Sequence, residues 1–126
     1  MCQRTLERET FGKKFHEYSS IRQEIAKAQC NIEQARLLTL SAADKMDKLG
    51  NKEAKDIIAM IKIVAPNMAQ KVIDSAMQIL GGKGVSQDTY LAHYFAIARM
   101  LRLADGPDEV HMYQLGKSCI QKYSNL

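Results

Sequence analysis

The sequence predicts an all-α protein, folded as an up-and-down four-helix bundle. Two long segments, residues 20–48 and 54–79, repeat apolar side chains at steps of three and four, which is the period of an amphipathic helix. A short turn joins them, so the two helices are expected to run antiparallel. No stretch alternates apolar and polar residues with a period of two, and no hairpin signal is present. Together these observations argue against a sheet.

The first half of the chain carries its own start and stop signals. A helical segment is expected to open the chain over about residues 1–10. Ser19 or Ser20 can cap the first long helix through a side-chain oxygen. Gly50 and Asn51 then mark its end, because glycine and asparagine readily leave helical geometry. The first half is thus predicted to contain one short and one long helix.

The second half begins with a helix that contains Pro66. A proline inside a helix lacks the backbone N–H and should bend it. Three glycines in the four residues 81–84 end this helix. A short helix is predicted from about residue 90 to residue 98 or a little beyond, and a closing helix from Pro107 to about Tyr123.

Composition bounds the class of protein. The chain has 126 residues, the size of one domain, and residues 1–126 are interpreted as a single domain. Its first helix begins without a cap, as expected for a piece of a longer protein. The net charge of +4 is scattered, and 6% aromatic residues without tryptophan argue against a nucleic-acid surface. No apolar run approaches the ~20 residues of a transmembrane helix.

The cysteines and histidines do not predict a metal site. Three cysteines lie far apart and form no C-x-x-C pair, so neither a disulfide framework nor a zinc site is expected. The three histidines share no spacing of four residues. A reducing compartment fits this pattern best.

The segment Ala104-Asp105-Gly106-Pro107 is the first candidate site. Gly106 releases the backbone from helical geometry, and Pro107 suits the first position of the next helix. Asp105 therefore lies on a corner between two helices. An aspartate there can cap the following helix, or it can act as a general base. The ten residues around the corner do not decide between these roles.

Two further segments have alternative interpretations. In Gln78-Ile79-Leu80-Gly81-Gly82-Lys83-Gly84, the glycines can terminate a helix, or they can let the backbone approach a ligand. Upstream, Arg8 precedes Phe11 by three residues. An arginine can bind a pyrophosphate, and a phenylalanine can lie against an adenine, but such a segment is more commonly a helix end with a packed aromatic residue.

The order and spacing of these segments resemble the C-terminal α-helical domain of the acyl-CoA dehydrogenases. The resemblance runs from about Leu6 to Tyr123. It includes Arg-x-Thr-Phe-Gly at residues 8–12, Ile-Glu-Gln-Ala-Arg at 32–36, the glycine segment at 78–84 and the corner at 104–107. Any one of these motifs is common, but four of them in register are specific. The Asp-Gly-Pro form of the corner resembles one branch of the family.

This resemblance implies an enzyme that holds FAD and oxidises an acyl-CoA thioester to a trans-2-enoyl-CoA in fatty-acid β-oxidation. Asp105 would be the catalytic base and Gly106 would contact the substrate. The cofactor-binding residues would be Arg8, Phe11, Gln78, Gly81, Gly82, Pro107 and Glu109. Because FAD contacts are shared between subunits in this family, a homodimer or homotetramer is implied. Electron-transferring flavoprotein or oxygen would accept the electrons.

The corner departs from the common pattern of the family. Asp105 replaces a glutamate, Ala104 replaces a tyrosine and Pro107 replaces a threonine. The shorter carboxylate must be brought closer to its substrate. Ser19 also stands where relatives carry a FAD-contacting glutamine, and that contact is not carried over.

Location and activity of the isolated chain follow from the same resemblance. A mitochondrial or peroxisomal location is expected, although the chain contains no targeting signal and its last three residues, Ser124-Asn125-Leu126, only resemble the peroxisomal Ser-Lys-Leu signal. Without the other domains the chain is expected to be inactive. A non-catalytic oligomerisation or interaction module is the alternative.

Overall fold

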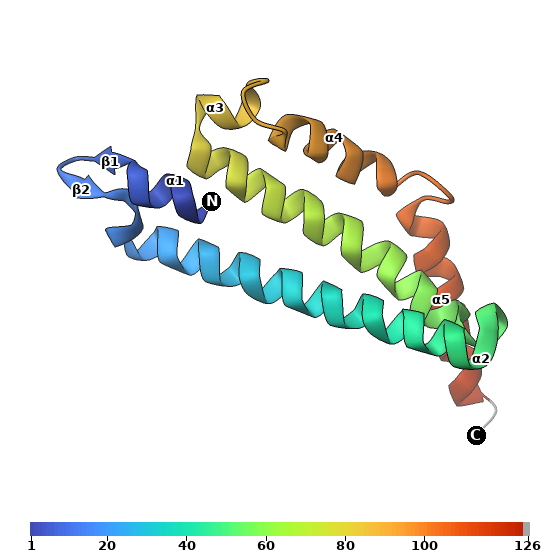
Figure 1. Cartoon of the computed structure of the whole chain (residues 1–126). Helices are drawn as coiled ribbons and strands as arrows, with labels where there is room; N and C mark the ends of the chain where they lie inside the picture. The colour runs from blue at the N-terminus through green and yellow to red at the C-terminus, as the bar shows by residue number, and fades with distance from the viewer. Residues whose placement is uncertain (125–126) are drawn as a thin grey trace.

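The computed structural model describes residues 1–124 and consists mainly of helices (Figure 1). Asn125 and Leu126, which complete the C-terminal tripeptide, lie outside the described residues. The elements in chain order are α1 (Cys2–Glu7), β1 (Glu9–Thr10), β2 (Lys13–Lys14), the 3-10 helix η1 (Phe15–Glu17), α2 (Ser19–Leu80), α3 (Gly82–Val85), α4 (Leu91–Leu101) and α5 (Asp108–Ser124). The predicted helical-bundle fold is confirmed.

The element α2 contains both predicted long helices, because Gly50 interrupts it. Gly50 has φ 78° and ψ 170°, a conformation outside the helical region that is strained for other residues. We call residues 19–49 the first arm and residues 51–80 the second arm. The arms run antiparallel, and α4 lies along the second arm (Figure 1). The second arm continues as a helix through Pro66.

The core is built mainly from alanines. Ala28, Ala35 and Ala42 recur every seventh residue on the first arm and are at most 4% exposed. Ala54, Ala59, Ala76 and Ile79 of the second arm and Ala98 of α4 are also buried. Small side chains at a helix interface let the helix axes approach closely. The fully buried part of the core therefore consists mainly of small side chains.

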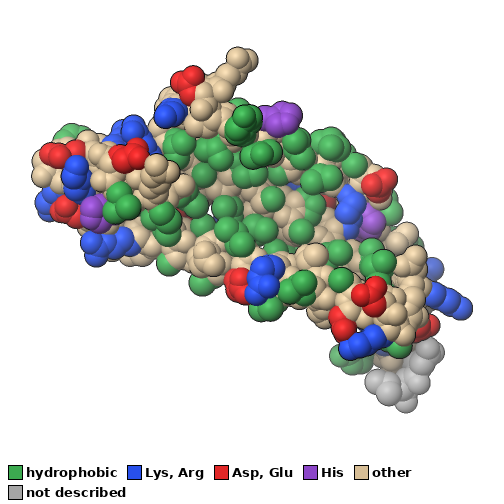
Figure 2. Space-filling view, viewed as in Figure 1, with side chains coloured by type: hydrophobic (Ala, Val, Ile, Leu, Met, Phe, Trp, Pro, Cys, Tyr) green, Lys and Arg blue, Asp and Glu red, His purple; other side chains and the backbone are tan. Residues whose placement is uncertain are grey.

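Many large apolar side chains remain on the surface. Ile32 and Met46 belong to the predicted apolar face of the first arm, yet they are 38% and 40% exposed. Figure 2 shows apolar side chains gathered on the face that carries the second arm and α4. The exposed apolar residues on one side of α4 are Tyr90, Tyr94, Ile97 and Leu101. Continuous exposed apolar faces of this kind are typical of surfaces that contact other protein parts.

The N-terminal segment differs from the prediction. The opening helix ends at Glu7 rather than near Thr10. A two-stranded antiparallel hairpin follows, in which Glu9 pairs with Lys14 and Thr10 with Lys13. Phe11 and Gly12 form its turn with φ 50° and 75°. The sequence lacked a hairpin signal because the strands have two residues each and the turn is not Asn-Gly.

The predicted serine cap of the first long helix is wrong. Tyr18 occupies the N-cap position, with extended backbone and no side-chain cap. Its hydroxyl instead donates a hydrogen bond of 2.7 Å to the carbonyl oxygen of Thr10. The Ser19 hydroxyl accepts a hydrogen bond from Gln23. The start of α2 is thus fixed by contact with the hairpin, which local sequence does not reveal.

Within residues 1–124, no helix is both long and apolar enough to cross a membrane. In the same part of the chain, no group of three or more His, Cys, Asp or Glu side chains could hold a metal ion. Cys2, Cys30 and Cys119 are free and exposed.

Candidate active site

The corner is the segment of residues 102–107 between α4 and α5. Asp105 and Gly106 both have left-handed backbone there, with φ 54° and 98°. Asp105 is exposed, and within residues 1–124 its carboxylate makes no hydrogen bond or ion pair. The helix α5 begins at Asp108, one residue after the predicted Pro107. Asp105 therefore does not cap α5, and the interpretation of Asp105 as a cap is wrong.

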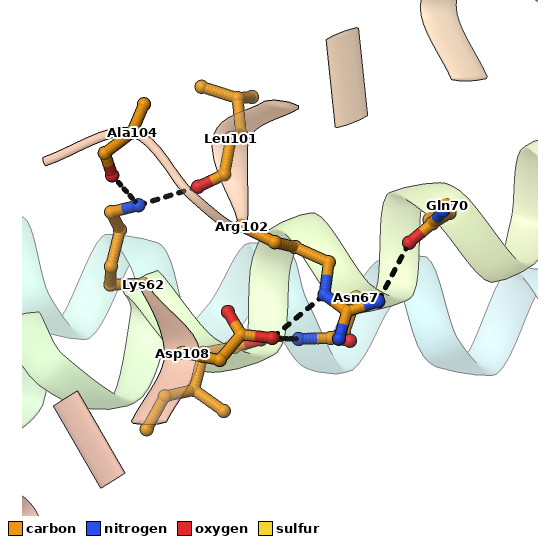
Figure 3. Close-up of polar contacts among 8 residues, drawn as sticks. Lys62, Asn67, Gln70, Leu101, Arg102, Ala104 and Asp108 are labelled. Carbon is orange, nitrogen blue, oxygen red and sulfur yellow. Dashed lines mark hydrogen bonds and ion pairs between the residues drawn. The ribbon is translucent and has the colours of Figure 1, made fainter. Parts of the chain in front are cut away.

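Asp108 is the acidic residue that holds the corner to the bundle (Figure 3). It is 5% exposed, and its Oδ2 accepts hydrogen bonds of 2.7 Å from Arg102 Nε and 3.0 Å from Asn67 Nδ2. Arg102 Nη1 also donates to Gln70 Oε1 at 3.0 Å. Burial by itself raises the pKa of the Asp108 carboxyl, but the hydrogen bonds from Asn67 and Arg102 outweigh it, so the pKa lies below its ordinary value.

Lys62 holds the same corner from the second arm. Its ammonium donates hydrogen bonds to the carbonyl oxygens of Leu101 and Ala104 (Figure 3). The last carbonyls of a helix lack partners within the helix, and a cation beside them is favourable. Lys62 therefore stabilises the end of α4 and the first part of the corner.

Asp105 lies on the edge of a groove of about 530 Å³. The walls are mainly apolar and are formed by Ile58, Ile61, Ala65, Pro66 and Leu101, and the polar lining residues besides Asp105 are Thr39, Lys62 and His111. Grooves with apolar walls and few polar groups suit largely apolar ligands. A carboxylate on such an edge can accept a proton from a carbon atom of a ligand in the groove.

Gly106 is packed against His111. A Cβ atom at position 106 would lie 3.2 Å from His111 Nε2, and φ of 98° disfavours any other residue there. The same His111 Nε2 lies 3.2 Å from the carbonyl oxygen of Asp105. Gly106 is therefore needed for the shape of the corner. Its predicted contact with substrate remains a prediction.

The predicted cofactor residues fall into two groups. Arg8, Phe11, Gln78, Gly81 and Gly82 belong to the end of the bundle that contains the hairpin and α3. Pro107 lies at the corner, and Glu109 lies in the first turn of α5. The eleven residues of α4 separate the two ends, which corresponds to roughly 16 Å at 1.5 Å per residue. The two groups thus belong to different places on this chain.

Arg8 and Gly81 are brought together by the fold. Arg8 Nη1 donates a hydrogen bond of 3.4 Å to the Ile79 carbonyl, and a Cβ at Gly81 would lie 3.6 Å from the same nitrogen. The aromatic partner of the guanidinium is Phe15, whose ring centroid is 5.0 Å away. Phe11 is 99% exposed at the turn of the hairpin.

The three glycines in residues 81–84 have different structural roles. Gly81 has φ 67° and ends α2. A Cβ at Gly84 would lie 2.6 Å from the Met77 carbonyl oxygen, so only glycine fits against the backbone of α2 there. Gly82 is exposed and has open space around it. The helix-terminator interpretation therefore holds for Gly81, and the excess of glycine arises partly from backbone packing.

Sequence reasoning missed Lys62, Asn67, Arg102 and Asp108. Lys62 and Asn67 are ordinary residues of a helical segment, whereas Arg102 and Asp108 flank the segment 104–107 and carry no local pattern that marks their role. One available signal was the position of Asp108 in the first turn of the last helix, where a carboxylate is favourable. Their importance comes from contacts between residues 6 to 42 positions apart.

A bundle with this corner and this glycine turn defines a known class of domain. The chain matches the family "Acyl-CoA dehydrogenase, C-terminal domain" over residues 1–120, and it belongs to the acyl-CoA dehydrogenase family. It is 53% identical over all of its 126 residues to the Arabidopsis thaliana protein named probable acyl-CoA dehydrogenase IBR3. It is 52% identical over 112 residues, 89% of the chain, to acyl-CoA dehydrogenase family member 11 of Homo sapiens. The family resemblance is confirmed.

Solved structures agree with this assignment. A protein from Mycobacterium abscessus, named as an acyl-CoA dehydrogenase, matches 97% of this chain with a TM-score of 0.94 and 48% identity. Butyryl-CoA dehydrogenase from Megasphaera elsdenii matches 94% with a TM-score of 0.86 and 29% identity. The chain covers 30% of each of these solved chains. It covers 15% and 14% of the two curated relatives above.

Proposed function

We propose that this chain works as the C-terminal domain of a flavin-dependent acyl-CoA dehydrogenase, in which Asp105 removes the α proton of an acyl-CoA thioester. The observation that carries the proposal is the position of Asp105. This residue lines an apolar groove, and its carboxylate has no hydrogen-bond partner within residues 1–124. Membership of the family supports the reaction class.

The proposed reaction forms a carbon–carbon double bond between Cα and Cβ of the acyl chain. The Cα–H bond breaks and its proton passes to a carboxylate oxygen of Asp105, while the electron pair of that bond forms the new double bond. FAD, when bound in the full protein, supplies the acceptor for the hydride that leaves Cβ. The apolar walls of the groove hold the acyl chain beside Asp105.

The residues at the other end of the bundle fit a phosphate-containing cofactor. Arg8 has five N–H donors and gives one to the Ile79 carbonyl, so it can bind a phosphate or pyrophosphate with others. Gln78 is exposed, and Gly82 leaves its backbone open to a ligand. Phe11, Pro107 and Glu109 complete the proposed FAD contacts, with the hairpin and the corner serving FAD molecules of different subunits.

The remaining parts of the proposal concern the cellular setting. The enzyme acts in fatty-acid β-oxidation as a homodimer or homotetramer, in mitochondria or peroxisomes. Electron-transferring flavoprotein or oxygen reoxidises the cofactor. These assignments rest on the family, and the exposed apolar side of α4 is consistent with an assembly.

The test of the base is Asp105→Asn in the enzyme with its other domains present. The amide keeps the size of the side chain but cannot take the proton, so turnover with acyl-CoA should fall on the order of 10³-fold. The absorbance of bound FAD should be unchanged. Asp47→Asn, an exposed aspartate on the first arm, is the matched control and should keep full turnover. Wild-type turnover in Asp105→Asn would remove Asp105 from the role.

The second candidate is a non-catalytic oligomerisation module, favoured by the apolar faces of α4 and α5. Tyr113 and Ile120 of α5 are 72% and 71% exposed. Light scattering of the purified chain at micromolar concentration tests this function. A strict monomer would count against this function. It would be favoured over the enzyme if the purified chain forms an oligomer and the longer protein shows neither FAD absorbance nor turnover.

A further inference from the structure

The peptide groups on both sides of Asp105 are held by basic side chains from different helices. The Ala104 carbonyl, in the peptide group before Asp105, accepts a hydrogen bond from Lys62 of the second arm. The Asp105 carbonyl, in the peptide group after it, lies 3.2 Å from Nε2 of His111 in α5. Because a carbonyl only accepts, this contact requires the proton of His111 on Nε2.

This arrangement fixes the two backbone dihedrals of Asp105. The angles φ and ψ describe how the preceding and the following peptide groups are rotated about Cα. A donor on each group therefore restrains both angles. The restraint matters because Asp105 has φ 54°, a left-handed backbone conformation that residues with a Cβ atom rarely adopt without support.

The two donors also stand at the groove. Lys62, His111 and Asp105 all line it. Other contacts already attach α5 to α2: Asp108 accepts a hydrogen bond from Asn67, and Ser118 donates to Asp56 at 2.8 Å. Attachment of α5 therefore does not depend on Lys62 or His111. Their hydrogen bonds act on the corner itself.

We propose that Lys62 and His111 are positioning residues that set the backbone of Asp105 and so aim its carboxylate at the α carbon of the substrate. The inference rests on the proposed role of Asp105 as the base. Misplacing a reacting group by about 1 Å can cost on the order of 100-fold in rate. A loss of either donor should thus slow proton abstraction without removing the base.

The experiment uses Lys62→Met and His111→Phe in the enzyme with its other domains present. Both changes remove the donor and keep a side chain of similar size. Each should lower kcat by about 10-fold or more, with little change in KM, because the groove remains. The isotope effect on kcat with α-deuterated acyl-CoA should rise. Lys71→Met on the second arm and His93→Phe on α4, both exposed, are the matched controls.

A double-variant cycle shows whether the two residues act through Asp105. Adding Lys62→Met to Asp105→Asn should cause no further loss of turnover, because there is no base left to aim. Amide hydrogen exchange gives a readout that does not depend on activity. Exchange in residues 102–107 should accelerate in Lys62→Met and in His111→Phe, while the arms of α2 keep their protection.

Three outcomes would overturn the inference. In the first, Lys62→Met and His111→Phe have the same kcat and the same amide exchange rates as the control variants. The second is faster exchange over the whole bundle with loss of FAD, which would mark both residues as merely structural. The third is additive losses in the double variant. A different result would show that Asp105 is not the base: the Asp105→Asn variant, with Lys62 and His111 intact, would retain its turnover.

Discussion

The two ends of α4 are joined to the rest of the chain by different means. At the corner, charged and polar side chains hold the backbone: Lys62 binds two carbonyls, and Asp108 binds Asn67 and Arg102. At the other end, glycine allows one backbone segment to pack directly on another, with Gly84 against Met77. A turn held by side chains leaves a functional group such as Asp105 exposed at its tip. A turn held by glycine offers open backbone instead.

The largest effect on stability is expected at the corner, from Asp108→Ala. The change removes the acceptor of Arg102 Nε and one of the two acceptors of Asn67 Nδ2. The free energy of unfolding should fall by about 2–3 kcal/mol, since one third of the Arg102 side chain is exposed and the cost is reduced by solvent. Urea unfolding of the purified chain measures this difference. Asp47→Ala, an exposed aspartate, is the control. An equal, small change in both variants would contradict the idea that side chains hold this end.

At the glycine end, Gly84→Ala should be the next largest change. The new Cβ would lie 2.6 Å from the Met77 carbonyl oxygen and 2.7 Å from Met77 Cα, so backbone must shift. Overpacking of this kind costs about 2 kcal/mol. Gly82→Ala provides the control, because nothing lies within 4 Å of its added Cβ. Melting curves that coincide for the two variants would show that residue 84 is not packed as described.

The smallest expected effect is on the pH dependence of the free energy of unfolding, which should differ between variants at the two ends of α4. The pKa of Asp108 is lowered in the folded state, so its stabilisation is fully present above the unfolded pKa of about 3.9 and is lost as pH falls through the folded value. Asp108→Asn should remove this part of the slope of unfolding free energy against pH.

Gly84→Ala should keep the wild-type slope, since its effect on packing does not involve a titrating group. Asp56 also has a lowered pKa, through hydrogen bonds from Lys122 and Ser118, but it is present in every variant and cancels. Urea unfolding between about pH 5 and pH 2 tests this. A wild-type slope in Asp108→Asn would show that the ion pair contributes no stability at neutral pH.

Prediction from sequence succeeded where local pattern and chain geometry agree. The period of three and four predicted both arms of α2, and Gly50 was correctly placed between them. Prediction failed at Ser19 and at the hairpin, where contacts with Tyr18 decide the backbone. The exposure of Ile32 and Met46 was also not predicted, because the helical period marks an apolar face but not which of its residues meet another helix.

In the candidate site too, some features could be predicted from the local sequence and others could not. Asp105 was found because Gly106 and Pro107 mark a break between helices, which is a local property of the chain. Whether Asp105 caps the next helix could not be found locally, since that depends on where α5 begins and on which acid is buried. Asp108 took the buried position because Asn67 and Arg102 surround it.

The sequence by itself determined the two long helices, their antiparallel order and the position of Asp105 between two later helices, because helical period and chain-breaking residues act over a few positions. Only the tertiary structure decided how that carboxylate is held. Lys62 reaches across from the second arm and His111 from α5, at separations of 42 and 6 residues from the carbonyls that they bind. The contact with Lys62 exists only once the helices have packed, so no local pattern records it.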